Sequence, residues 1–206
     1  MIAGLLIAAC GGASTATPLA VPSPAGPTTT SSAAVPSESP SAAAATGSGT
    51  AAASGQAAPF ALTSPAFRDG GPIAREFTCD GAGGSPALRW SGVPSGAAAL
   101  VLEVIDIDAS FIHWLVLDLP PTSPGSLAAG VGTGSGDPQQ GTNSFGQVGW
   151  GGPCPPSGTH HYVFVLSALA APLGLSGHPS PRTVENAIAA GTLLGRARLT
   201  GTYRRG

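Results

Sequence analysis

Two carboxylates, two imidazoles and one phenol stand where apolar strands are expected to begin or end: Asp106, Asp108, His113, His160 and Tyr162. A protonated imidazole donates hydrogen bonds to an anion, and a nearby carboxylate fixes its tautomer and favours its protonated form. A phenol adds one more donor. If these side chains converge, they could hold a small anion.

The spacing of these residues favours convergence. Asp106 and Asp108 close the apolar run 99–105, and His113 opens the next apolar run only five residues later. A link this short keeps both strand ends at the same edge of a sheet. Side chains alternate along a strand, so His160 and Tyr162 point to one face and His161 points to the other. We therefore leave His161 out of the candidate site.

The segment GGPCPPSGTHHY (151–162) leads into the third apolar run. Glycines allow a ligand to approach the backbone, and prolines hold the loop in an extended path because their φ angle is fixed. Backbone N–H groups beside imidazoles would make a small anion site. We therefore add Gly151, Gly152 and Pro153 to the candidate ligand-binding residues.

Other interpretations of these residues remain open. An aspartate at a strand end often pins a turn, and His113 could be an ordinary half-buried residue. The same carboxylates and imidazoles could activate water in a hydrolase, either directly or through a metal, since both are acceptable ligands for Zn²⁺ or Mn²⁺. The sequence has no nucleophile elbow, phosphate-binding P-loop or H-E-x-x-H motif. The leading hypothesis is a binding module without catalytic residues, cofactor or metal.

The surrounding sequence predicts mainly strands. Runs 99–105, 114–119 and 162–169 are short and rich in Val, Ile and Leu, and 196–203 alternates apolar and polar residues. One helix is expected, with Ser180 as N-cap, Pro181 as its first residue and Gly191 after its end. Many strands, turn-rich connections and one late helix predict a β-sandwich-like domain.

The chain divides by composition into two parts. Residues 11–58 are almost wholly Ala, Ser, Thr, Pro and Gly, and we expect them to form a disordered tether that reaches on the order of 40 Å. Residues 59–206 have the length of one domain. The formal net charge is −2 and the sequence contains no Lys. Without a basic stripe, we expect no nucleic-acid partner, and no pattern identifies a protein partner.

The first ten residues, MIAGLLIAAC, resemble a bacterial lipoprotein signal that ends at Cys10. Its cysteine would carry a lipid, anchoring the protein to a membrane outside the cytoplasm. No Arg or Lys precedes the apolar run, although a signal peptide usually has one, and a start codon assigned too late would explain this. The alternative is an apolar segment with an incidental cysteine.

Two further cysteines, Cys79 and Cys154, lie in the expected domain. Cysteines outside the cytoplasm often pair, so we expect a disulfide between them. The alternative is two buried free thiols.

Five segments together resemble the phosphatidylethanolamine-binding protein family, specifically its bacterial Raf-kinase-inhibitor-like branch: SPAFRDGGPIAREFTCDG (64–81), DIDAS (106–110), FIHWLVLDLP (111–120), TNSFGQVGWGGPCPPSGTHHYVF (142–164) and LTGTYRR (199–205). The resemblance implies a β-sandwich of two antiparallel sheets with a C-terminal helix. It also implies a small pocket for phosphate, acetate or the phosphoryl group of phosphoethanolamine. The implied pocket residues are Asp106, Asp108, His113, His160 and Tyr162, with Gly151, Gly152 and Pro153 in the lining loop. By analogy with eukaryotic relatives, regulation of a partner protein is a further possibility.

Overall fold

The computed structural model describes residues 58–205. Cys10 and nearly all of the expected tether therefore lie outside the described residues. The described elements are β1 (Ala61–Thr63), β2 (Gly71–Pro72), the 3₁₀ turn η1 (Arg75–Phe77), β3 (Leu88–Ser91), β4 (Ala99–Asp106), β5 (Phe111–Leu119), β6 (Gly125–Leu127), β7 (Thr159–Leu169), α1 (Pro181–Ala190) and β8 (Leu193–Arg204). Among them, no helix is long and apolar enough to cross a membrane.

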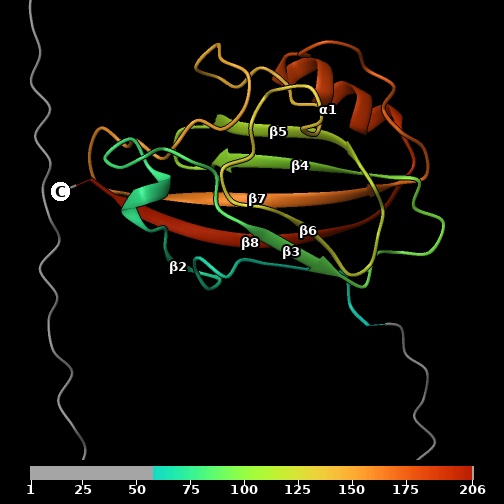
Figure 1. The fold of residues 1–206 in the computed structure, drawn as a ribbon, viewed down its shortest axis with the longest axis horizontal. Helices are drawn as coiled ribbons and strands as arrows, with labels where there is room; N and C mark the ends of the chain where they lie inside the picture. The colour runs from blue at the N-terminus through green and yellow to red at the C-terminus, as the bar shows by residue number, and fades with distance from the viewer. Residues whose placement is uncertain (1–57, 206) are drawn as a thin grey trace, which may run out of the picture. The chain divides into compact units, whose positions relative to one another are not determined.

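The strands form two sheets (Figure 1). The larger sheet has the order β2-β8-β7-β4-β5, and the smaller one has the order β1-β3-β6. All pairings are antiparallel except that of β2 with β8, which is short and parallel. The predicted class, a β-sandwich of two sheets with one short helix, is confirmed.

The main core fills the space between the sheets. Its large buried side chains come from both layers and include Trp90, Leu100, Trp114, Phe164 and Leu199. Strand β8 alternates as predicted, because Ala197, Leu199 and Gly201 are buried while Arg196 and Arg198 are exposed. The buried apolar surface is the main favourable term for this fold.

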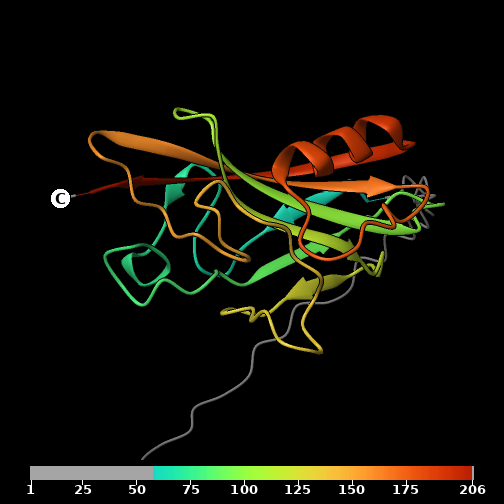
Figure 2. The same cartoon turned by 90° about the horizontal axis from the view of Figure 1, so that it is seen from above.

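Helix α1 covers part of the opposite face of the larger sheet (Figure 2). It begins as predicted, since the Ser180 hydroxyl accepts a hydrogen bond from the Thr183 N–H and Pro181 is the first helical residue. Val184 and Ile188 are its buried residues, and they pack in the cluster that contains Val101, Leu115, Leu117 and Leu169. The sandwich therefore carries one helix as an outer layer.

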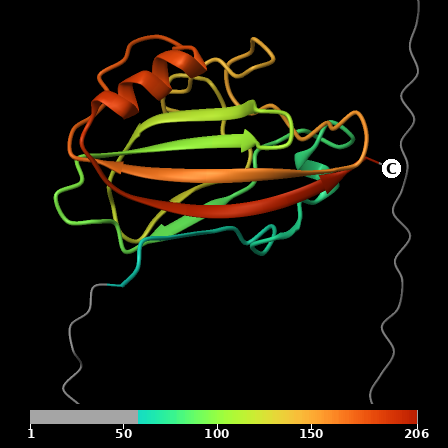
Figure 3. The same cartoon turned by 180° about the vertical axis from the view of Figure 1, so that it is seen from behind.

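The ends of four strands meet at one end of the larger sheet and position the candidate site. Strands β4 and β5 form a hairpin, so Asp106 pairs with Phe111 across it. On the other side of β4, Asp106 pairs with Tyr162 near the start of β7. The end of β8 lies beside the start of β7 (Figure 3). In this pairing Tyr203 lies opposite His160. The short link after Asp108 therefore does keep these strand ends at one edge of the sheet.

Candidate functional site

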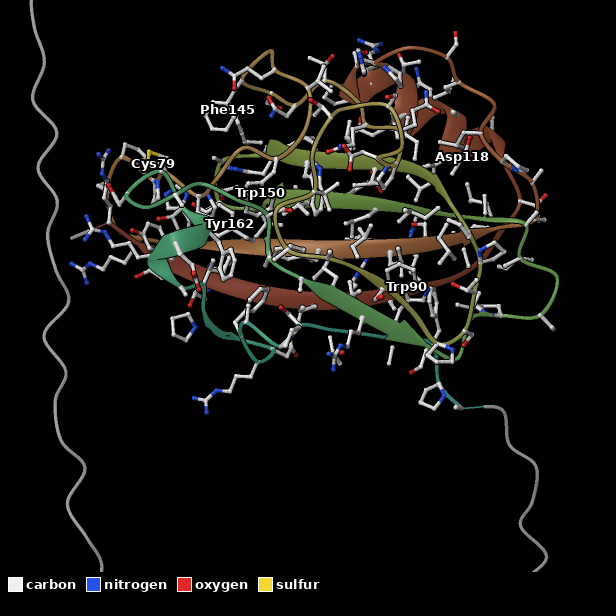
Figure 4. All side chains as sticks on the ribbon, viewed as in Figure 1. Cys79, Trp90, Asp118, Phe145, Trp150 and Tyr162 are labelled. Atoms are coloured by element: carbon white, nitrogen blue, oxygen red, sulfur yellow. A yellow bond between two sulfur atoms is a disulfide. The ribbon has the colours of Figure 1, made fainter. Side chains whose placement is uncertain are left out.

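A pocket of about 180 Å³ opens at this end of the larger sheet. Its polar lining comes from four of the expected residues: Asp106, His113, His160 and Tyr162. Its apolar lining includes Phe111, Phe145, Pro155 and Pro156. Figure 4 shows Phe145, Cys79 and Tyr162 at this end of the molecule, far from Trp90 and Asp118.

Asp106 organises two parts of the site at once. One carboxylate oxygen, Oδ1, accepts hydrogen bonds from the backbone N–H groups of Asp108 and Ala109, at 3.0 and 3.2 Å. The other, Oδ2, lies 2.6 Å from Nδ1 of His160. An ionised carboxylate only accepts hydrogen bonds, so Nδ1 of His160 carries a proton there. Asp106 thus pins the turn after β4 and leaves Nε2 of His160 for a ligand.

His113 is oriented by the loop between β6 and β7. Its Nδ1 lies 2.6 Å from the carbonyl oxygen of Gly151, which can only accept. In the neutral ring, Nε2 therefore carries a lone pair, and it becomes a donor when the ring is protonated. Burial lowers the pKa of His113 below its ordinary value, and the Gly151 carbonyl and the Asp106 carboxylate partly oppose this shift. The ring is therefore mainly neutral at pH 7 while the pocket is empty.

Tyr162 lies at the floor of the pocket. Its side chain is fully buried, yet its hydroxyl has no hydrogen-bond partner within residues 58–205. Burial raises the pKa of Tyr162 well above its ordinary value, and the charge of the Asp106 carboxylate and its close approach to the hydroxyl raise it further. The hydroxyl therefore keeps its proton, and a ligand oxygen would compete for that proton with the nearby Asp106 carboxylate.

Asp108 does not line the pocket, contrary to the sequence expectation. Oδ2 of Asp108 accepts two hydrogen bonds from His161, one from the backbone N–H at 2.7 Å and one from the ring Nδ1 at 3.0 Å. These bonds from His161 lower the pKa of Asp108. Strand β4 ends at Asp106, so the two-residue alternation that would place both carboxylates on one face stops there. His161 does point away from His160, as expected, but it forms this exposed pair.

Gly151, Gly152 and Pro153 lie behind the pocket wall. The N–H of Gly151 donates to the carbonyl of His113 at 2.8 Å and is not available to a ligand. A Cβ on Gly152 would lie 3.0 Å from backbone atoms of Phe77 and Thr78, and Pro153 accepts a hydrogen bond from the N–H of Cys79. The expectation that this loop offers backbone donors is wrong for Gly151. The segment instead positions the residues that follow it.

The aromatic wall was absent from the sequence expectation. Phe145 packs edge-on against Phe111 and His113, with ring centroids 4.6 and 5.4 Å away. Phe111 precedes His113 by two residues in a strand, so the alternation rule could have found it. Phe145 belongs to a distant loop that the buried Asn143 side chain holds through bonds to Phe145, Gln147 and Gly149. No local pattern signals that contact.

A disulfide joins Cys79 to Cys154, and their Cα atoms are 5.4 Å apart. The two cysteines are therefore not free thiols in this structure. Cys154 also lines the pocket, beside Pro155. The disulfide thus connects the pocket wall to the segment after η1.

The sequence profile described as "Phosphatidylethanolamine-binding protein" matches residues 63–204. The chain belongs to the phosphatidylethanolamine-binding protein family. A relative from Methanothermobacter thermautotrophicus, named "UPF0098 protein", is 43% identical over 151 residues, which cover 70% of this chain and 99% of the relative. A Mycobacterium tuberculosis relative named "Putative lipoprotein LppC" is 42% identical over 156 residues, which cover 71% of this chain and 73% of the relative.

Solved structures of family members have the same fold. YbcL from Escherichia coli, described as a member of the mammalian PEBP family, matches with a TM-score of 0.66 and 31% identity. That match covers 72% of this chain and all of YbcL. CT736 from Chlamydia trachomatis matches with a TM-score of 0.63 and 34% identity, over 71% of this chain and 98% of CT736.

Proposed function

We propose that this phosphatidylethanolamine-binding protein family member is an extracytoplasmic binding protein, anchored to a membrane by a lipid on Cys10. In this proposal it holds a small anionic or phosphorylated ligand in the pocket at the end of β4 and β7. The groups that contact the ligand are His113, His160 and Tyr162, while Asp106 orients His160 and Asp108 supports the rim through His161. No step of the proposed function requires bond cleavage or a cofactor.

The buried hydroxyl of Tyr162 is the observation that carries the proposal. A buried polar group without a partner costs about 1–3 kcal/mol, and this hydroxyl lies in a pocket beside two imidazoles. A ligand oxygen would satisfy it. None of the described residues that line the pocket is Arg, so protonated imidazoles must supply any positive charge. An anion that binds there would favour the protonated form of His113.

The proposed anchor is supported by the sequence around Cys10 and by the name of the LppC relative. The phosphorylated ligand is supported by the name of the family, because phosphatidylethanolamine carries a phosphoryl group. Both arguments are independent of the pocket geometry.

A titration tests the ligand. The full chain is titrated with phosphate, acetate and phosphoethanolamine at pH 6 and pH 8, and the ring signals of His113 and His160 are followed by NMR. Saturable shifts of both rings, larger at pH 6, are expected. If none of the three anions shifts either ring, the proposed ligand class is wrong. A His160→Ala variant serves as the control, since it should lose the response.

A metal-assisted hydrolase is the second candidate. One ligand atom from each of Asp106, Asp108 and His160 lies within 4.8 Å of the others. These are suitable ligand types for Zn²⁺ or Mn²⁺, although a metal on Nδ1 of His160 would require that nitrogen to lose its proton and its hydrogen bond to Asp106. Metal analysis of the purified protein, with an assay on an aryl phosphate, distinguishes the candidates. A stoichiometric metal with turnover would favour the hydrolase.

A further inference from the structure

The segment 152–158, which carries the pocket wall at Cys154, Pro155 and Pro156, has very few backbone hydrogen bonds. Pro153, Pro155 and Pro156 have no N–H group to donate. Within residues 58–205, the only backbone hydrogen bond to this segment runs from the N–H of Cys79 to the carbonyl of Pro153, at 3.1 Å. Pro153 and Pro155 are buried, so this hydrogen bond and their packing also hold the wall, and the disulfide is its covalent link to the segment after η1.

The same disulfide lies directly at the pocket. Cys154 is a lining residue, and Pro155 and Pro156, which follow it, form the wall. Cys79 is exposed and Cys154 is half-buried, so a reductant in solution can reach the bond. Exposed disulfides are the ones that exchange most readily.

The Cys79 side of the bond has several other attachments. The adjacent Asp80 accepts hydrogen bonds from the hydroxyl of Tyr203 at 2.7 Å and from Nε of Arg205 at 3.2 Å. The Phe77 carbonyl accepts one from the indole N–H of Trp150 at 3.1 Å. If the disulfide opens, the segment around Cys79 keeps these contacts, whereas the wall keeps one backbone hydrogen bond and the packing of Pro153 and Pro155, and residues 156–158 are exposed. Opening the bond therefore frees the wall from its one covalent link across the pocket end.

We propose that the Cys79–Cys154 disulfide positions the pocket wall and couples ligand affinity to the redox state of the protein. This inference rests on the proposed anion-binding function. Reduction is carried out by a dithiol, which transfers two electrons and two protons. The S–S bond breaks, both cysteines become thiols, and the dithiol becomes a disulfide. The freed wall must then be ordered again when a ligand binds, and the entropy of that ordering weakens binding.

The coupling is reciprocal. If reduction weakens ligand binding by some factor, the ligand must make the disulfide harder to reduce by the same factor. For a two-electron couple, a tenfold factor corresponds to about 30 mV in the midpoint potential. If the disulfide only stabilised the fold and had no effect on ligand affinity, the ligand would not change its midpoint potential.

The test uses the full chain with Cys10→Ser, so that Cys79 and Cys154 are its only cysteines. Phosphoethanolamine affinity is measured by calorimetry for the oxidised protein, for the protein reduced by dithiothreitol, and for a Cys79→Ser, Cys154→Ser variant. We expect about tenfold weaker binding in the last two states. The midpoint potential is then measured in dithiothreitol redox buffers with and without phosphoethanolamine, and we expect the ligand to lower it by about 30 mV.

A matched control separates wall positioning from loss of stability. Ile188→Ala removes a buried side chain beneath α1, remote from the pocket, and should destabilise the domain while leaving the affinity of the oxidised protein unchanged. Equal affinity in the oxidised and reduced states, or an unchanged midpoint potential, overturns the inference. Absence of binding in the oxidised parent overturns the proposed function itself, and the inference with it.

Discussion

Tyr162 has the one buried side-chain polar atom of residues 58–205 that lacks a hydrogen-bond partner. In Tyr162→Phe, the unsatisfied group is lost, so we expect the free energy of unfolding to stay constant or rise by about 1 kcal/mol. Anion affinity should fall about tenfold, because the ligand loses a donor. Tyr203→Phe is the matched control: its hydroxyl donates to Asp80, so stability should fall and affinity should remain. Thermal unfolding and calorimetric titration measure both quantities, and unchanged affinity in Tyr162→Phe would contradict the role.

Also at the residue scale, the protonation of His113 should make anion affinity depend on pH. Because burial holds the pKa of His113 below 6.5, the ring gains its charge only as the pH falls through that lowered value. Affinity for sulfate, whose charge is constant in this range, should rise about tenfold from pH 8 to pH 5, since a charged donor contributes about 1.5 kcal/mol or more. His113→Gln should lose most of this rise. A parent protein with constant affinity would show that His113 does not contact the anion.

Lower pH should have the opposite effect on folding stability through His113 when no anion is present: it should weaken the fold. The unfolded chain binds a proton on His113 with a pKa near 6.5, whereas the folded chain has a lower pKa at this residue. The unfolded state therefore binds more protons between these two values, and stability should decrease as the pH falls below about 6.5. Sulfate should reduce this loss in the parent and not in His113→Gln. Unfolding curves with and without sulfate, between pH 5 and pH 8, provide the measurement.

At the scale of elements, β5 separates the core from the site. His113 faces the pocket, while the next residue, Trp114, is fully buried between the sheets and donates to Gln140. We expect Trp114→Ala to reduce the free energy of unfolding by about 3–5 kcal/mol. Ile107→Ala is the control, since Ile107 is 56% exposed and its loss should change stability by no more than about 0.5 kcal/mol. A Trp114→Ala variant as stable as the parent would contradict this packing.

The elements that could be predicted from the sequence are those whose pattern of apolar and polar residues is long enough to recognise within one segment. The apolar runs of β4, β5 and β7, the alternation of β8 and the capped α1 all fall into this group. Strands β1, β2, β3 and β6 have two to four residues each and depend on pairing with distant segments, so periodicity could not find them. The site follows the same rule: His160 and Tyr162 were placed by alternation within β7, whereas Asp108 lies in a turn where alternation no longer applies, and Phe145 reaches the pocket from a loop.

At the scale of the whole molecule, the proposal combines a pocket with a membrane anchor at the other end of the sequence. If Cys10 carries a lipid, Cys10→Ser should move the protein from the membrane fraction to the soluble fraction of cells that export it. The pocket lies entirely within residues 106–162, so the variant should bind sulfate with the parent's affinity. Immunoblots of the two fractions and mass spectrometry of the N-terminal peptide make the measurement. A parent protein whose Cys10 has no lipid, or a variant that stays with membranes, would contradict the anchor and leave the pocket argument intact, because the two rest on separate residues.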